Sequence, residues 1–222
     1  MGTRRTQVRA LVPFLVRAVH WQPVPVAGVL SAVLLWWQHD AVTSPGPAVW
    51  VLRAVALLLA AAVPFGLDDR TRVTLAAVPA PLWWRVVLRV VAVVVPAGLA
   101  WTAALAWVAG RVEGSLPATA LSLEAGALLV TLLATAAALA RWRGVTDPGT
   151  ATAPLVVALA LLLPALPESV TMMGLPGPGW DAAHQRWAVL LGLAAAVLAM
   201  SLVDPGRRGA WVASRSWASP SR

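Results

Sequence analysis

Residues 67–91 read LDDRTRVTLAAVPAPLWWRVVLRVV and stand between two long apolar segments of the chain. The stretch opens with two aspartates, carries four arginines and is interrupted by Pro79 and Pro81. Acidic residues favour the first turn of a helix, and proline ends one. The pattern therefore predicts a short helix over residues 70–78, followed by Arg85 and Arg89 where the next apolar segment enters lipid.

The composition around this stretch is that of an integral membrane protein. Of the 222 residues, 59% are hydrophobic and 12% are charged, and the mean hydropathy is +0.77. Soluble domains carry about 25% charged residues. A membrane span needs about 20 residues, so the length allows about six spans with short loops. The bias toward alanine, valine, leucine and arginine is typical of a GC-rich bacterial genome, which predicts a bacterial cell membrane as the location.

We expect a single transmembrane domain over residues 1–222, in which residues 23–203 form an all-α bundle of six transmembrane helices. The predicted spans are residues 23–38, 47–66, 86–109, 118–140, 153–167 and 187–203. Residues 4–20 carry apolar positions at helical spacing with arginines off that stripe, which predicts an amphipathic helix in the membrane interface within residues 1–22. The alternative is that these residues form the irregular cytoplasmic end of the first span. Residues 204–222 are polar and predict a flexible tail.

The arginines predict the orientation of the bundle. With the N-terminus inside, only Arg111 and Arg186 fall on the outside, and Arg53 falls within a span. The fourteen arginines on the inner segments are Arg4, Arg5, Arg9, Arg17, Arg70, Arg72, Arg85, Arg89, Arg141, Arg143, Arg207, Arg208, Arg215 and Arg222. This bias follows the positive-inside rule and places both termini in the cytoplasm. Residues 67–91 then become a cytoplasmic loop.

One outer segment, residues 164–187, is too long for a tight turn. It is weakly apolar and rich in glycine and proline. We expect either a partly buried cap or a pair of short helices that dip into the outer leaflet. Irregular backbone at that depth is tolerated only against protein or water.

Motifs for catalysis are absent from the sequence. Without lysine there is no phosphate-binding GxxxxGK[ST] loop, and without cysteine there is no disulfide or thiolate metal site. His20, His39 and His184 fall on different loops, which argues against a metal site. We therefore expect no enzyme and no cofactor in this chain.

Two ionisable residues lie within or near spans. Arg53 either extends to the outer headgroups or faces the bundle and meets an anionic substrate or a carboxylate such as Asp40. Glu124 lies either at the interface or on a cavity. Both are candidates for a substrate path, and their apolar surroundings leave the direction of each side chain open.

The stretch that opens this section resembles the first cytoplasmic loop of type-2 permeases of ATP-binding-cassette (ABC) transporters. Asp68 or Asp69 matches the acidic start of that loop, and Val73-Thr74 matches its Gly-Thr-like step, with valine in place of glycine and aspartate where glutamate is commoner. The basic positions, the short helix, the proline break and the basic start of the third span are matched by Arg70, Arg72, Leu75–Val78, Pro79, Pro81, Arg85 and Arg89.

The resemblance implies a permease subunit that works as a pair, with itself or with a sister chain. Two separate ATPase subunits, which bind ATP and magnesium, would receive the loop in a surface groove. The docking residues implied by the resemblance are Asp68, Asp69, Arg70, Arg72, Thr74, Leu75, Val78 and Pro79. The cargo expected from the resemblance is an exported drug, lipid or peptide, and heme-exporter-like permeases are similar in length and loop pattern. The alternative is a non-transporting six-span scaffold, immunity factor or regulator.

Overall fold

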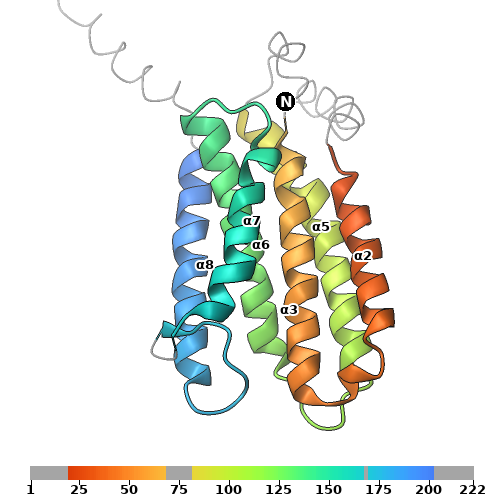
Figure 1. Ribbon diagram of the computed structural model, residues 1–222. Coiled ribbons are helices and arrows are strands. Elements are labelled where there is room, and N and C mark those ends of the chain that lie inside the picture. The colour runs from red at the N-terminus through yellow and green to blue at the C-terminus, as the bar shows by residue number, and fades with distance from the viewer. Residues whose placement is uncertain (1–19, 69–81, 168–169, 203–222) are drawn as a thin grey trace, which may run out of the picture.

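The computed structural model of the chain describes residues 20–68, 82–167 and 170–202. All regular structure in these ranges is helical, and the long helices stand side by side in one bundle (Figure 1). The elements are α2 (Pro23–Trp37), η1 (Ala41–Thr43), α3 (Pro45–Ala62), η2 (Val63–Leu67), α5 (Leu82–Ala109), α6 (Ala118–Trp142), α7 (Pro148–Ala165) and α8 (Trp180–Leu202).

Five segments of the bundle are long and apolar enough to cross a membrane, namely α3 with η2, and α5, α6, α7 and α8. The all-α, multi-span character that the composition predicts is therefore confirmed. The remaining predicted span, residues 23–38, corresponds to α2, which has 15 residues. At 1.5 Å per residue α2 is about 22 Å long, which is shorter than the roughly 30 Å of a hydrocarbon core.

The helices α3 and α6 form the centre of the bundle. In their most apolar windows, 67% and 50% of the residues are buried, against 22% for α5 and α7 and 17% for α8. The helix α3 contacts α2, α5 and α6, and α6 contacts α7 and α8 as well. Side chains on the inner faces of these two helices are therefore shielded from lipid, whereas those of the outer helices are mostly exposed to it.

The helix starts follow local sequence chemistry. Proline occupies the first turn of α2, α3 and α7, where its missing N–H costs nothing. The helix α7 begins five residues before the predicted 153, and α8 begins seven residues before the predicted 187. Gly177 and Gly179 precede α8 with φ of 153° and 85°, which only glycine adopts readily, so the chain can turn sharply into that helix.

The connections gather at the two ends of the bundle (Figure 1). One end, here called the Asp68 end, holds the start of α2, the end of η2, the start of α5, the α6–α7 connection and the end of α8. The opposite end holds the α2–α3 and α5–α6 connections and the cap, a name used here for residues 171–179. The cap consists of turns and bends, which agrees with the first of the two alternatives for the long outer segment.

Three predicted features lie outside the described residues. They are the interfacial helix over residues 4–20, of which only His20 is described, the short helix over residues 70–78 and the tail over residues 204–222.

Candidate functional site

An ionic cluster lies inside the bundle near the cap end, and its first member is Arg53 of α3. The arginine sits on the helix face that also carries Val49, Leu52 and Ala56, all of which are buried. Only 4% of Arg53 is exposed. Of the two alternatives for Arg53, the structure shows the one that faces the bundle.

The partner of Arg53 is Glu124 of α6 rather than Asp40. Arg53 Nε donates to Glu124 Oε2 over 2.7 Å, and Arg53 Nη2 donates to Glu124 Oε1 over 2.7 Å. This bidentate ion pair matches the planar guanidinium to both carboxylate oxygens. Glu124 is 1% exposed, so it lies at neither the interface nor an open cavity. The pair joins the two central helices of the bundle.

The cap lies over this pair and is held by its backbone carbonyls. Arg53 donates from Nη1 to the carbonyl of Met173 over 2.7 Å and from Nη2 to that of Gly174 over 2.9 Å. Two residues of α8 hold the preceding carbonyls: Arg186 Nη1 donates to Thr171 O over 2.7 Å, and Trp187 Nε1 donates to Met172 O over 2.6 Å. Four consecutive carbonyls are thus satisfied by side chains, which is how irregular backbone is stabilised near lipid.

His184 of α8 completes the cluster. Its Nε2 lies 3.1 Å from Glu124 Oε1, and its Nδ1 lies 2.8 Å from the carbonyl oxygen of Trp180. The Trp180 ring packs on the imidazole with the ring centroids 4.1 Å apart. The guanidinium carbon of Arg53 lies 5.2 Å from the Trp50 ring centroid and 5.9 Å from that of Trp180. Indole faces attract cations, so both rings stabilise positive charge here.

The cluster is closed rather than open. The side chains of Arg53, Glu124 and His184 are 3%, 2% and 11% exposed. Within the described residues, no three histidine, cysteine, aspartate or glutamate side chains lie close enough to hold a metal ion. The chemistry that remains is ion pairing, proton binding and attachment of the cap. Ionisable groups are costly to bury inside an apolar bundle, which makes this cluster the candidate functional site of the described residues.

At the opposite end of the bundle, Asp68 is a buried anchor. The Asp68 residue is 3% exposed, and its Oδ1 accepts a hydrogen bond of 2.8 Å from the backbone N–H of Gly149 in the first turn of α7. The Nδ1 of His20 lies 3.8 Å from Asp68 Oδ2, and the His20 ring meets the edge of Phe65. A carboxylate at a helix N-terminus satisfies a free N–H and complements the helix dipole. Asp68 therefore ties the end of η2 to α7.

The structure separates the predicted site residues into two groups. Arg53 and Glu124 come together in the cluster, and Asp68 lies at the other end of the bundle. The other docking residues, Asp69, Arg70, Arg72, Thr74, Leu75, Val78 and Pro79, lie outside the described ranges.

Sequence reasoning missed three members of the cluster region: His184, Trp180 and Trp187. The first turns of α8 contain Asp181, His184, Gln185 and Arg186, whose polarity assigns them to a loop when spans are chosen by hydropathy. A signal was nevertheless present. Positions 180, 184 and 187 are spaced as one face of a helix, which would have pointed this histidine and both tryptophans in the same direction.

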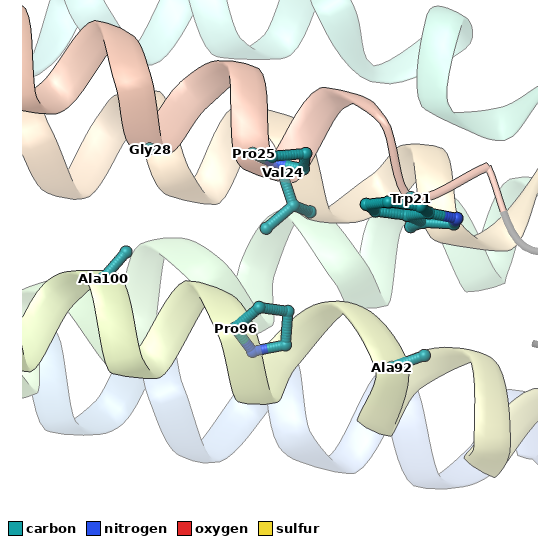
Figure 2. A pocket seen from close by; sticks show the side chains of 7 residues that line it. All are labelled: Trp21, Val24, Pro25, Gly28, Ala92, Pro96 and Ala100. Atoms are coloured by element: carbon teal, nitrogen blue, oxygen red, sulfur yellow. The ribbon is translucent and has the colours of Figure 1, made fainter.

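An apolar groove lies between α2 and α5. Figure 2 shows Val24 and Pro25 on one side and Ala92, Pro96 and Ala100 on the other, with Trp21 at one end. The groove has a volume of about 270 Å³, and no ionisable residue lines it. Its lining is almost entirely apolar, so it can accept apolar groups but offers few polar atoms with which to select among them.

Comparison of the chain with protein-family models, with curated proteins and with solved structures finds no match. The functional assignment therefore depends on the geometry described above and on the sequence pattern of the loop.

Proposed function

We propose that the chain is a transmembrane permease subunit of an ABC transporter, moved by a separate ATPase that docks on residues 69–79. The proposed assembly contains two such subunits, identical or related, in a bacterial cell membrane. ATP and magnesium would bind only to the ATPase. The cargo class proposed is a hydrophobic or amphipathic molecule, exported from the cell.

The observation that carries this proposal is the close packing of η2, the element that immediately precedes the 69–79 loop. The loop leaves η2, which packs against α5, α6 and α7. Its first residue, Asp68, is bonded to the N-terminus of α7. A force applied to residues 69–79 would therefore be transmitted to three helices through packed contacts instead of being absorbed by a flexible linker.

Close packing at this junction supports the same argument. A side-chain carbon at Gly149 would come within 2.7 Å of Phe65 Cα, so α7 approaches η2 as closely as the backbone allows. At Gly66, such a carbon would lie 2.5 Å from a methyl group of Val93 in α5. Two glycines thus bring three elements into direct contact beneath the loop.

Asp68 and the rest of the predicted docking set have different roles in this proposal. The Asp68 carboxylate is buried and bonded within the bundle, so it transmits motion instead of touching the partner. Asp69, Arg70, Arg72, Thr74, Leu75, Val78 and Pro79 form the docking surface, assisted by the interfacial helix over residues 4–20.

The proposed topology has six spans with both termini in the cytoplasm. The helix α2 is the first span, and the Asp68 end of the bundle faces the cytoplasm. The cap and the ionic cluster then lie toward the outside. Because the cluster is closed, it is not a cargo path in this state, and the accessible groove between α2 and α5 is apolar.

The test is co-purification with a candidate ABC ATPase, the first choice being one encoded by a neighbouring gene. We expect the wild-type chain to retain the ATPase and to stimulate ATP hydrolysis. The double change Asp69→Arg with Leu75→Glu reverses a charge and places another in an apolar contact, so it is expected to abolish both while leaving membrane insertion unchanged.

A matched control is available at the same end of the bundle, at the end of α6 and on the α6–α7 connection. Trp142 and Asp147 are exposed there, and Trp142→Glu with Asp147→Arg repeats the same chemical changes away from the loop. This control is expected to keep the ATPase. If the loop variant still binds and stimulates the ATPase, the docking assignment is wrong. An isolated gene without an ATPase neighbour favours a non-transporting scaffold or regulator.

A further inference from the structure

The hydrogen-bonding requirements of His184 point to a further role of the ionic cluster. The carbonyl oxygen of Trp180 can only accept, so the Nδ1 that lies 2.8 Å from it must carry a hydrogen. If that were the only ring hydrogen, Nε2 would be a buried nitrogen without a hydrogen-bond partner. Yet Nε2 lies 3.1 Å from Glu124 Oε1. We infer that the Glu124–His184 pair is a proton-binding site and that its bound proton keeps the cap closed.

The proton belongs on the imidazole. Both oxygens of Glu124 accept hydrogen bonds from Arg53, which is the arrangement of an ionised carboxylate. An imidazolium donates from Nδ1 to Trp180 O and from Nε2 to Glu124 Oε1, so both ring nitrogens are satisfied. The indole of Trp180, with its centroid 4.1 Å from that of the imidazole, adds a face that attracts a cation.

Among the residues that the structure describes, few charged groups surround His184. Arg53 from α3 and Glu124 from α6 face it, and the cap residues 171–179 contain no charged side chain. On α8 itself, Asp181 is exposed, and Arg186 donates to Thr171 O. The cluster with its proton therefore carries two positive charges and one negative charge. The carbonyls of Met173, Gly174 and Trp180 offset the excess with their negative ends.

Loss of the proton disrupts this balance. The Nε2 lone pair would then face a carboxylate oxygen at 3.1 Å, and two acceptors repel each other strongly where water is excluded. His184 must turn or withdraw. Its neighbours on α8, Arg186 and Trp187, hold two cap carbonyls, so a shift of the first turns of α8 loosens the cap. Proton release is thereby converted into opening at the cap end.

Cap opening is measurable by cysteine labelling, because the chain has no cysteine of its own. Met173 is 8% exposed and contributes its backbone carbonyl to Arg53, so Met173→Cys places a thiol under the cap while keeping that carbonyl. Ser115→Cys on the α5–α6 connection supplies an exposed reference thiol. The ratio of maleimide labelling rates at the two positions removes the common effect of pH on thiol reactivity.

The ratio is measured between about pH 5 and about pH 9, a range that brackets ordinary histidine titration. We expect it to rise at least about tenfold with pH in the otherwise unchanged chain, because the closed population falls as the proton leaves. In His184→Gln, an amide N–H replaces the Nε2 donor without titrating, so the ratio stays low and flat. In His184→Ala the donor is lost, so the ratio stays high and flat.

Two labelling results overturn the inference. One is a ratio that does not change with pH in the unchanged background. The other is a His184→Gln variant that keeps the full pH dependence, since the titrating group would then lie elsewhere. Both measurements need no ATPase, so their failure is distinct from failure of the docking proposal.

A direct measurement on the wild-type chain guards against a misfolded variant. With ¹⁵N-histidine, the chain shows only His20, His39 and His184, and the His20→Gln and His39→Gln variants assign the signals. We expect both ring nitrogens of His184 to be protonated under the conditions in which the labelling ratio is low. A bare-nitrogen signal from His184 under those conditions excludes the bound proton.

Discussion

At the scale of single residues, the Arg53–Glu124 pair explains how charges persist inside so apolar a chain. Moving either group out of water alone is costly, and the cost is offset only when the partners are close and their remaining hydrogen-bonding atoms are satisfied. Here the carboxylate receives two N–H groups, and the guanidinium reaches two carbonyls besides. The cluster is therefore stable as a unit and costly to dismantle in part.

The first prediction concerns this mutual dependence. Arg53→Met or Glu124→Gln alone leaves a buried partner uncompensated, so each is expected to lower the free energy of unfolding by about 3–5 kcal/mol. The double variant removes both charges and should lose about 1–3 kcal/mol less than the sum of the single losses. Denaturant unfolding in detergent micelles, followed by tryptophan fluorescence, measures all three.

Glu113→Gln is the control, because Glu113 is an exposed glutamate on the α5–α6 connection. Its effect on the unfolding free energy should stay within about 0.5 kcal/mol. Strict additivity of the Arg53 and Glu124 changes would show that the two side chains do not act on each other, contrary to their 2.7 Å contacts.

At the scale of elements, the junction of η2 with α7 depends on the absence of a side chain. Gly149→Ala would place a methyl group 2.7 Å from Phe65 Cα and 2.8 Å from two atoms of its ring. The backbone at Phe65 cannot give way cheaply, so the second prediction is a loss of about 1–3 kcal/mol of unfolding free energy. The shift in thermal unfolding midpoint in detergent measures it.

Gly192→Ala provides the matched comparison on α8, because nothing lies within 4 Å of the added carbon. Alanine is a better helix former than glycine, so this variant should be neutral or up to about 1 kcal/mol more stable. Equal destabilisation by both changes would mean that the contact at Phe65 is unimportant.

The long elements were predictable because hydropathy reports what a segment can bury in lipid. The predicted 47–66 and 118–140 closely match Pro45–Leu67 and Ala118–Trp142, since both segments are predominantly apolar over a length that spans the hydrocarbon core. The start of α8 was not predictable by this criterion. Asp181, Gln185 and Arg186 make its first turns polar, and helix formation there depends on contacts with the cap and with α6.

The candidate site was predictable only as separate residues. An arginine and a glutamate within apolar segments stand out by their cost in lipid, so Arg53 and Glu124 could be named from the sequence. Their pairing could not, because it depends on how α3 and α6 rotate about their axes. That rotation is set by packing along both helices, and the apolar positions around each charge allow several directions.

At the scale of the whole molecule, the third prediction tests the proposed orientation. Ser115 and Thr146 are exposed and lie on connections at opposite ends of the bundle. In intact cells, a membrane-impermeant maleimide should label the Ser115→Cys variant, whereas the Thr146→Cys variant should react only after the membrane is permeabilised. Reversed labelling would invert the topology and place the 69–79 loop outside, where no ATPase could reach it.

The long-range pairing of α3 with α6 also has a consequence for how the chain is made. Arg53 precedes Glu124 by 71 residues, so at about 5–20 residues per second its counter-ion is synthesised roughly 4–14 seconds later. During that interval a newly translated α3 cannot settle in hydrocarbon with its charge neutralised. Ribosome stalling or a nonsense codon before position 124 would leave Arg53 in the membrane without its counter-ion. Membrane quality-control proteases could recognise that unpaired charge in the truncated chain.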